Sequence, residues 1–96
     1  MAANDYMAFG FLKAAQEAGA RPGRDFHHVG VDDAPESRTL GLTSFRRPLS
    51  AMGREAARIA WGAIHGEREI KQVRLSSVLV SRSSSGLLDR VYEDVD

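Results

Sequence analysis

The sequence predicts an α/β fold with a partial, open and mostly parallel sheet flanked by helices. Two long segments have the apolar spacing of amphipathic helices, and short segments with strand character lie between and after them. Such alternation is typical of the crossover units that build parallel sheets. The 96 residues are enough for one small domain or for one piece of a larger one.

The first helix is predicted between a polar cap and a glycine. Asn4 or Asp5 can accept a hydrogen bond from a free N–H group of the first turn, and Gly19 suits the left-handed position after the last turn. Phe9 is a large apolar residue on the otherwise polar side of this helix. The opposite, apolar side consists of Met7, Ala8, Phe11, Leu12, Ala15 and Ala18.

The middle of the chain is predicted to contain two short strands. Pro22-Gly23 mark a turn, and residues 26–31 follow as a strand that is apolar on both faces, as expected for a covered parallel strand. Residues 36–41 are predicted as a loop, and residues 40–45 as the second strand.

The second helix is predicted from Pro48 to about His65. Proline is tolerated in a first turn because its missing N–H group would be unpaired there, and Gly66 follows as the cap. The stripe that we expect to be buried consists of Leu49, Met52, Ala56, Ile59, Ala60, Ala63 and Ile64.

The end of the chain is predicted as a strand followed by a tail. Residues 70–82 alternate and are rich in β-branched residues, with a bend at Ser76-Ser77, and residues 83–86 form a loop. The acidic residues 87–96 end without a cap, and a tail is favoured over a short helix. We therefore expect one domain portion over residues 1–86 and a tail over residues 87–96.

Composition argues against several classes of protein. Lys plus Arg and Asp plus Glu both number 13, and this zero net charge argues against a dedicated nucleic-acid-binding domain. The absence of cysteine removes disulfides, thiol catalysis and sulfur-based zinc sites. No apolar run approaches the roughly 20 residues that cross a bilayer, and no signal peptide is visible, so we expect a cytoplasmic chain without membrane association.

Amide and carboxylate groups lie where predicted strands give way to a loop or a helix. Asn4-Asp5 and Asp32-Asp33 occupy such positions, and open parallel sheets bind ligands beyond the carboxyl ends of their strands. These groups suit hydroxyl-rich ligands such as sugars or nucleosides. From the residues alone, the simpler interpretation is favoured, in which they only cap a helix and end a strand.

Four blocks of the sequence resemble, in order, motifs of the lactose/galactose-repressor (LacI/GalR) family. Residues 3–10, ANDYMAFG, are similar to A-N-D-x-M-A-x-G, and residues 29–33, VGVDD, to V-G-[FY]-D-D/N. Residues 42–56 contain LTS, a proline, MG and an alanine, and resemble L-T-T-[VI]-x-Q-P followed by M-G-x-x-A. Residues 79–84, LVSRSS, resemble L-[VI]-x-R-x-S/T. Four such blocks in family order are a specific signal.

This resemblance implies the C-terminal part of an effector-binding and dimerisation domain with a type I periplasmic-binding-protein-like fold. In that fold, two α/β subdomains close on a small effector, and a separate helix-turn-helix binds operator DNA. The chain resembles about the last third of such a protein. The passage around residues 42–47 crosses between subdomains in the family and has no partner subdomain here. The implied partners are a small sugar- or nucleoside-like effector, a second copy of the chain, and operator DNA through the absent helix-turn-helix.

Effector contacts are also implied by the resemblance. Asn4 matches a position that commonly touches the effector, and Asp32 matches an acidic position that often binds a ligand hydroxyl or amine. Asp5 is expected to be structural, as a helix cap. We expect Asn4 and Asp32 to lie near each other at the rim of one cleft.

A dimer interface is implied on the first helix. Phe9 and Lys13 match the face that packs across the two-fold axis of the family dimer. The helical periodicity supports this for Phe9, because it places this large apolar residue on the otherwise polar side of the helix. Residues 35–40, Glu36 among them, are expected to join that interface.

Several residues depart from the family pattern. Val31 replaces the usual aromatic residue, and His28 replaces a usually aliphatic one. Arg46-Arg47 replace the usual polar pair before the proline. The loop over residues 33–42 is shorter than is typical and lacks the usual proline directly before the L-T-T block.

Alternative functions have weaker support. The histidines lack metal-ligand spacing and the serines of residues 81–85 lack a G-x-S-x-G context, so we expect neither metal, cofactor nor enzymatic activity. An enzyme on a flavodoxin-like sheet would need a glycine-rich phosphate loop or an acid–base pair. A fragment of the sugar-binding component of an ABC transporter would share the fold but be monomeric and exported. Self-association of the chain through exposed apolar surface is a further possibility.

Overall fold

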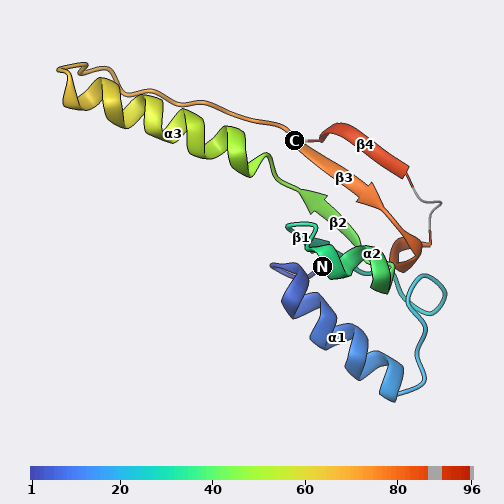
Figure 1. Ribbon diagram of the computed structural model, residues 1–96. Helices are drawn as coiled ribbons and strands as arrows, with labels where there is room; N and C mark the ends of the chain where they lie inside the picture. Colours follow the sequence, from blue (N-terminus) through green and yellow to red (C-terminus); the bar gives the residue numbers. More distant parts are fainter. Residues whose placement is uncertain (87–89, 96) are drawn as a thin grey trace.

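The computed structural model describes residues 1–86 and 90–95 and contains one open four-stranded sheet with helices (Figure 1). The strands lie in the order β1-β2-β3-β4. They are β1 (Val29–Val31), β2 (Thr43–Arg46), β3 (Ser77–Ser81) and β4 (Arg90–Val95). The α/β class and the open sheet are confirmed, and both early strands are shorter than predicted.

The sheet is mixed, so the expectation of mostly parallel strands is wrong. Only β1 and β2 pair in parallel, whereas β2 with β3 and β3 with β4 pair antiparallel. The reason lies in the connection between β2 and β3, which leaves and returns at the same end of β2. A parallel pairing would require that connection to cross to the other end of the sheet.

Helix α1 (Asp5–Glu17) has the predicted termini. The Asn4 side chain caps it by accepting a hydrogen bond from the Met7 N–H group at 2.9 Å, and Gly19 follows the helix with a φ of +81°. The cap is therefore Asn4, and the role of helix cap expected for Asp5 is wrong.

Residues expected to form a loop instead form helix α2 (Pro35–Leu40). Pro35 supplies a φ angle suited to a first turn, and Gly41 ends the helix in the left-handed region with a φ of 68°. The helix starts at Pro35 and ends before Gly41, and its six residues are too few to show helical periodicity in the sequence. Residues 83–85, also expected in a loop, form a single turn of 3₁₀-helix, η1 (Ser83–Ser85).

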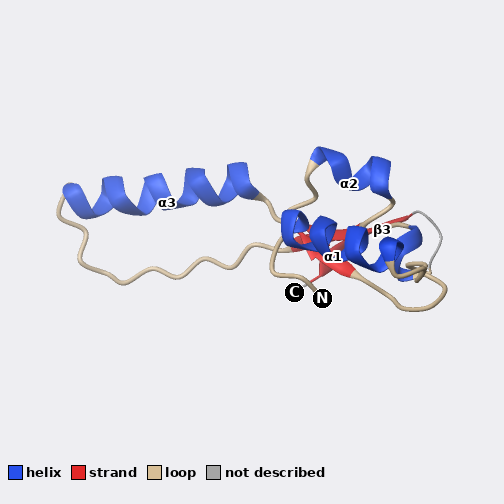
Figure 2. Cartoon of the chain, turned by 90° about the horizontal axis from the view of Figure 1, so that it is seen from below, coloured by secondary structure: helices blue, strands red, loops and turns tan. Residues whose placement is uncertain are grey.

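Helix α3 (Leu49–Ile64) agrees closely with the predicted bounds, but its apolar stripe is not buried. The helix extends away from the sheet, and residues 65–76 return beside it without pairing as a strand (Figure 2). The chain therefore measures 59 × 23 × 19 Å. Leu49 is 54% and Ile64 75% exposed, because a single extended segment is too narrow to cover the stripe.

Residues 90–95, expected in a tail, form β4 at the edge of the sheet. Val91 pairs with Val80 and Tyr92 with Leu79, so β4 satisfies backbone groups of β3 that would otherwise be unpaired. Residues 87–89 and 96 of the predicted tail lie outside the described residues.

The core of the fold contains a buried carboxylate. Asp5 is 0% exposed, and its Oδ2 accepts hydrogen bonds from the Ala34 N–H group at 2.7 Å and the Ser37 hydroxyl at 2.5 Å. Its Oδ1 accepts a hydrogen bond from the Ser44 hydroxyl at 2.7 Å. A Cβ atom at Gly30 would collide with this oxygen. One side chain of α1 thus joins α2 and β2 and packs on β1.

A second polar junction connects β1, β2 and the segment after β3. The Thr43 N–H group donates to the Ser84 hydroxyl at 2.8 Å, and this hydroxyl donates to the His28 carbonyl at 2.6 Å. The Arg82 N–H group donates to the Thr43 hydroxyl at 2.8 Å. The serine-rich segment after β3 therefore serves structure, by satisfying buried backbone groups.

Replacing the buried carboxylate should destabilise the chain strongly. Asp5→Ala leaves the Ala34 N–H group and two serine hydroxyls without their acceptor, and we expect a loss of about 3 kcal/mol or more in the free energy of unfolding. Urea denaturation followed by circular dichroism measures this loss. Glu17→Ala, at an exposed position of the same helix, is the control, with an expected change within about 0.5 kcal/mol. Equal stability of the two variants would contradict the role given to Asp5.

Candidate effector-binding site

The two aspartates after β1 adopt left-handed backbone angles. Asp32 has a φ of 112° and Asp33 a φ of 55°. The Asp32 N–H group donates to the Phe45 carbonyl at 2.8 Å, and the Asp33 N–H group donates to the Ser44 hydroxyl at 2.9 Å. Residues other than glycine rarely occupy this region, and such strain gathers at functional sites. The bonds to β2 hold the turn in place.

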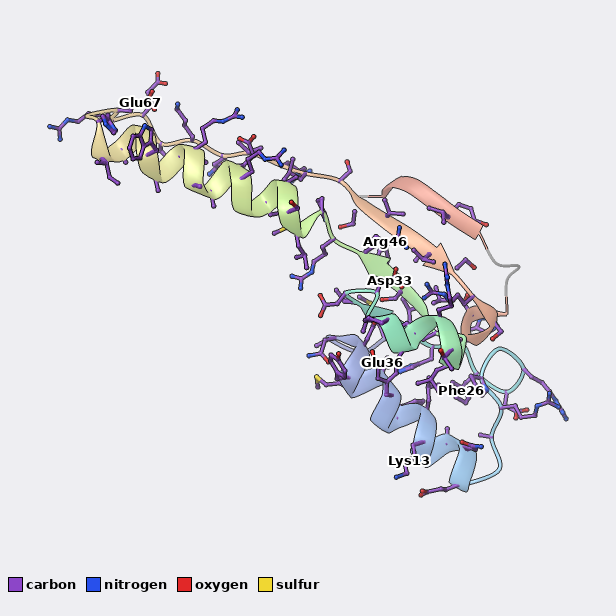
Figure 3. All side chains as sticks on the ribbon, in the orientation of Figure 1. Lys13, Phe26, Asp33, Glu36, Arg46 and Glu67 are labelled. Atoms are coloured by element: carbon purple, nitrogen blue, oxygen red, sulfur yellow. The ribbon has the colours of Figure 1, made fainter. Side chains whose placement is uncertain are left out.

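Each of the two carboxylates has its own arginine from the end of β2. Arg47 donates to Asp32, whereas Arg46 donates to Asp33 with its Nε at 2.9 Å (Figure 3). Arg82 forms an ion pair with the other oxygen of Asp33 at 2.8 Å. The Asp33 and Arg82 side chains are only 8% and 11% exposed, while the Asp32 side chain is 31% exposed. Asp33 is therefore structural, and Asp32 is the more accessible carboxylate.

These arginines determine the acidity of Asp33. Burial by itself would raise the pKa of the Asp33 carboxyl group, but its hydrogen bonds and charge interactions with Arg82 and Arg46 outweigh burial and hold the pKa below its ordinary value. Asp33 thus remains ionised and bound to both arginines at neutral pH. No local pattern in the sequence reveals this network, although the Arg46-Arg47 pair stands out as a departure from the family pattern.

Asn4 belongs to a segment that runs beside β1. The Ala2 N–H group donates to the Val29 carbonyl at 2.9 Å, and Asp5 packs against Gly30, so residues 2–5 run alongside this strand. Asn4 is therefore part of a segment that neighbours β1, and Asp32 directly follows β1. The Asn4 Oδ1 is engaged by the helix cap, which leaves its NH₂ group to donate to a ligand. Neither residue lines any of four hollows found among residues 1–86 and 90–95, so their common role in effector binding stays a prediction.

The residues predicted at a dimer interface lie on exposed or half-exposed surface. Phe9 and Lys13 line an open hollow of about 840 Å³ that extends to Leu40 of α2. Glu36 is exposed on α2 but does not line this hollow. Figure 3 labels Lys13 and Glu36 on their helices.

The apolar side of α1 is also less buried than predicted. Met7 is 59% and Phe11 51% exposed, while Ala8 is fully buried. The cause is the short length of β1, against which α1 packs, because three residues cannot cover a helix of 13. The dimer contact itself stays a prediction.

His28 is buried, at a position that is usually aliphatic in the LacI/GalR family, which the sequence resembles. Its ring stacks on Phe11 with 4.4 Å between ring centroids, and it is 6% exposed. Burial lowers the pKa of His28, and the positive N-terminal amino group lowers it further. His28 therefore acts as a neutral core residue. Within the described ranges, no group of three His, Cys, Asp or Glu residues could hold a metal ion, and no helix there is long and apolar enough to span a membrane.

Comparison with known proteins assigns the fold. The periplasmic binding protein-like domain family matches residues 1–85. The chain belongs to this family. This match, together with the regulators described in the next two paragraphs, confirms the LacI/GalR resemblance of the four sequence blocks.

Two curated relatives are similar over most of the chain. The HTH-type transcriptional repressor MelR of Bacillus subtilis is 34% identical over 87 residues, which are 88% of this chain and 25% of the relative. The HTH-type transcriptional regulator MalR of Clostridium butyricum is 33% identical over 85 residues, or 86% of this chain and 25% of the relative. The chain thus spans about a quarter of the length of these relatives.

Two solved structures share the arrangement of elements. A probable transcription regulator from Thermus thermophilus is 36% identical with a TM-score of 0.68, over 90% of this chain and 34% of that one. A LacI-family transcriptional regulatory protein from Corynebacterium glutamicum is 27% identical, also with a TM-score of 0.68, over 92% of this chain and 34% of that one. The periplasmic-binding-protein-like architecture is therefore common to this chain and to LacI-family regulators.

The Asp33 network should make stability fall in acid. The folded-state pKa of Asp33 lies below its unfolded-state value of about 3.9, so in acid the unfolded chain binds more protons than the folded chain. The stabilisation is complete above about pH 4 and is lost as pH falls through the folded-state pKa. Urea denaturation of the wild type and of Asp33→Asn between neutral pH and acid measures this. We expect the two curves to converge in acid, and a constant difference would contradict the assignment.

Proposed function

We propose that the chain is the ligand-sensing and dimerisation part of a LacI/GalR-type DNA-binding transcriptional regulator. In this proposal the intact protein binds a small sugar- or nucleoside-like effector, and the binding of effector and of operator DNA are coupled, typically by about 1–3 kcal/mol. The observation that carries the proposal is the match of residues 1–85 to the periplasmic binding protein-like domain, together with relatives that are transcriptional regulators. Such a protein works in the cytoplasm and is not an enzyme.

Asn4 and Asp32 are the proposed effector ligands. Asn4 belongs to the segment that runs alongside β1, and Asp32 follows that strand; they offer an amide donor and an accessible carboxylate to ligand hydroxyls. Arg47 holds the Asp32 carboxylate in place without burying it. The strained angle of Asp32 further supports a functional role, because strain of this kind is retained where geometry matters.

A sugar-binding component of a transporter is the alternative with the same fold. The curated relatives argue for the regulator, since both are HTH-type transcriptional regulators. The coding sequence upstream of residue 1 distinguishes the two functions, because a regulator carries a helix-turn-helix there and an exported protein a signal peptide.

Loss of the Asp32 carboxylate should weaken effector binding in a full-length protein that contains this chain. Asp32→Asn removes the charge but keeps the shape, and we expect about a tenfold or greater loss of affinity for the effector, as for a hydrogen bond to a charged group. Calorimetric titration with a panel of sugars and nucleosides measures this. Glu17→Gln, at an exposed position on α1, is the control and should bind as the wild type does.

The 96-residue chain by itself should bind such effectors weakly or not at all, because the residues of the opposing subdomain are absent from it. Tight sugar binding by the chain alone would contradict this division of the site.

A charge placed on the interface helix should disrupt self-association. Phe9→Glu puts a carboxylate into the proposed two-fold contact, and we expect a shift from dimer to monomer in the full-length protein by sedimentation equilibrium. The matched control is Ile70→Glu, which changes an apolar residue that is 93% exposed and far from α1. Dimerisation that survives Phe9→Glu would exclude this face as the interface.

A further inference from the structure

Three arginines from three different elements converge on one face of the sheet. Two hollows, of about 660 and 280 Å³, are both lined by Arg38 of α2, Arg46 of β2 and Arg82 after β3. The proposed effector ligands Asn4 and Asp32 line neither hollow, although Asp33, the neighbour of Asp32, lines the smaller one.

Positive charge is in excess at this place. Among the described side chains that line the two hollows, Asp33 is the single carboxylate, and it is shared between Arg46 and Arg82. The Arg38 guanidinium has no hydrogen bond or ion pair with any residue described. Three guanidinium groups therefore face one carboxylate, which leaves two positive charges uncompensated within this part of the chain.

Two of the three arginines, Arg82 and Arg46, are held in position before any ligand arrives. Arg82 is only 11% exposed and donates to the Leu42 carbonyl at 2.7 Å in addition to its ion pair with Asp33. Arg46 is fixed on the same aspartate through two of its nitrogens, at 2.9 and 2.8 Å. Guanidinium groups that are already ordered lose little conformational freedom when they bind an anion.

We propose that this pocket binds a small phosphate monoester. Such a group carries a charge of about −1.5 to −2 at neutral pH, which matches the excess of positive charge, and its oxygens suit the paired N–H donors of guanidinium groups. Leu40, Val80 and Val91 line the rest of the larger hollow. The pocket thus has apolar walls for the organic part of the ester beside its cationic part.

Calorimetric titration of the chain with phenyl phosphate, inorganic phosphate and phenol tests the proposal. We expect saturable binding of phenyl phosphate, weaker binding of inorganic phosphate and none of phenol. Arg38→Ala should weaken phenyl phosphate binding by about tenfold, because it removes a charge-assisted hydrogen bond. Arg38 has no partner in the described fold, so the variant should fold as the wild type does.

Arg54→Ala is the matched control, because Arg54 is likewise an exposed helical arginine but lies on α3. It should leave the affinity unchanged. Equal loss in the two variants would reduce the effect to general charge attraction and overturn the proposal. Absence of saturable binding to the wild type would overturn the proposal as well. Phenol binding as tight as that of phenyl phosphate would also overturn it, because the pocket would then recognise only the apolar ring.

Discussion

The fold depends on the carboxylate of Asp5, which is buried and yet fully engaged. A charge or polar group inside a protein is costly unless hydrogen bonds replace those of water. Asp5 receives three such bonds from residues on α2, β2 and the turn before α2. Because the donors come from separate elements, the bonds can form together only when those elements are correctly placed. In this small chain, which has few buried apolar residues, these hydrogen bonds determine how the helices and strands are arranged.

The same constraint continues from the core to the surface through a series of polar contacts. The Ser44 hydroxyl donates to Asp5 and accepts from the Asp33 N–H group, and Asp33 in turn binds Arg46 and Arg82. The accessible Asp32 is the neighbour of this anchored residue. The Asp32 carboxylate, a candidate ligand-binding group, is held by Arg47 on one side and by this anchored neighbour on the other, and it stays 31% exposed.

The elongated shape reflects a division of the chain into a sheet-centred part and a projecting part. The sheet, α1 and α2 share the buried polar network, whereas α3 and the returning segment have an apolar surface that no other described element covers. The LacI/GalR resemblance implies that the passage around residues 42–47, which contains β2, crosses between two subdomains. The apolar stripe on α3 is thus a surface that lacks a neighbour among the described residues.

The sequence by itself determined what local chemistry controls. The helices α1 and α3 were predicted to within a residue or so, because caps, glycines and apolar periodicity act over a few residues. The LacI/GalR relationship followed from four ordered motifs, since these are properties of the linear chain. Only the tertiary structure decided that β3 returns antiparallel to β2, that residues 90–95 pair as a strand, and that Asp5 binds α2 and β2 rather than capping its own helix. The first and the last of these outcomes depend on contacts between residues some 30 or 40 positions apart, and the pairing of residues 90–95 depends on β3 being in place, so no local pattern specifies the partner. Burial of the α3 stripe could not be predicted for the same reason, because a stripe shows which face can be covered but not whether a neighbour is present.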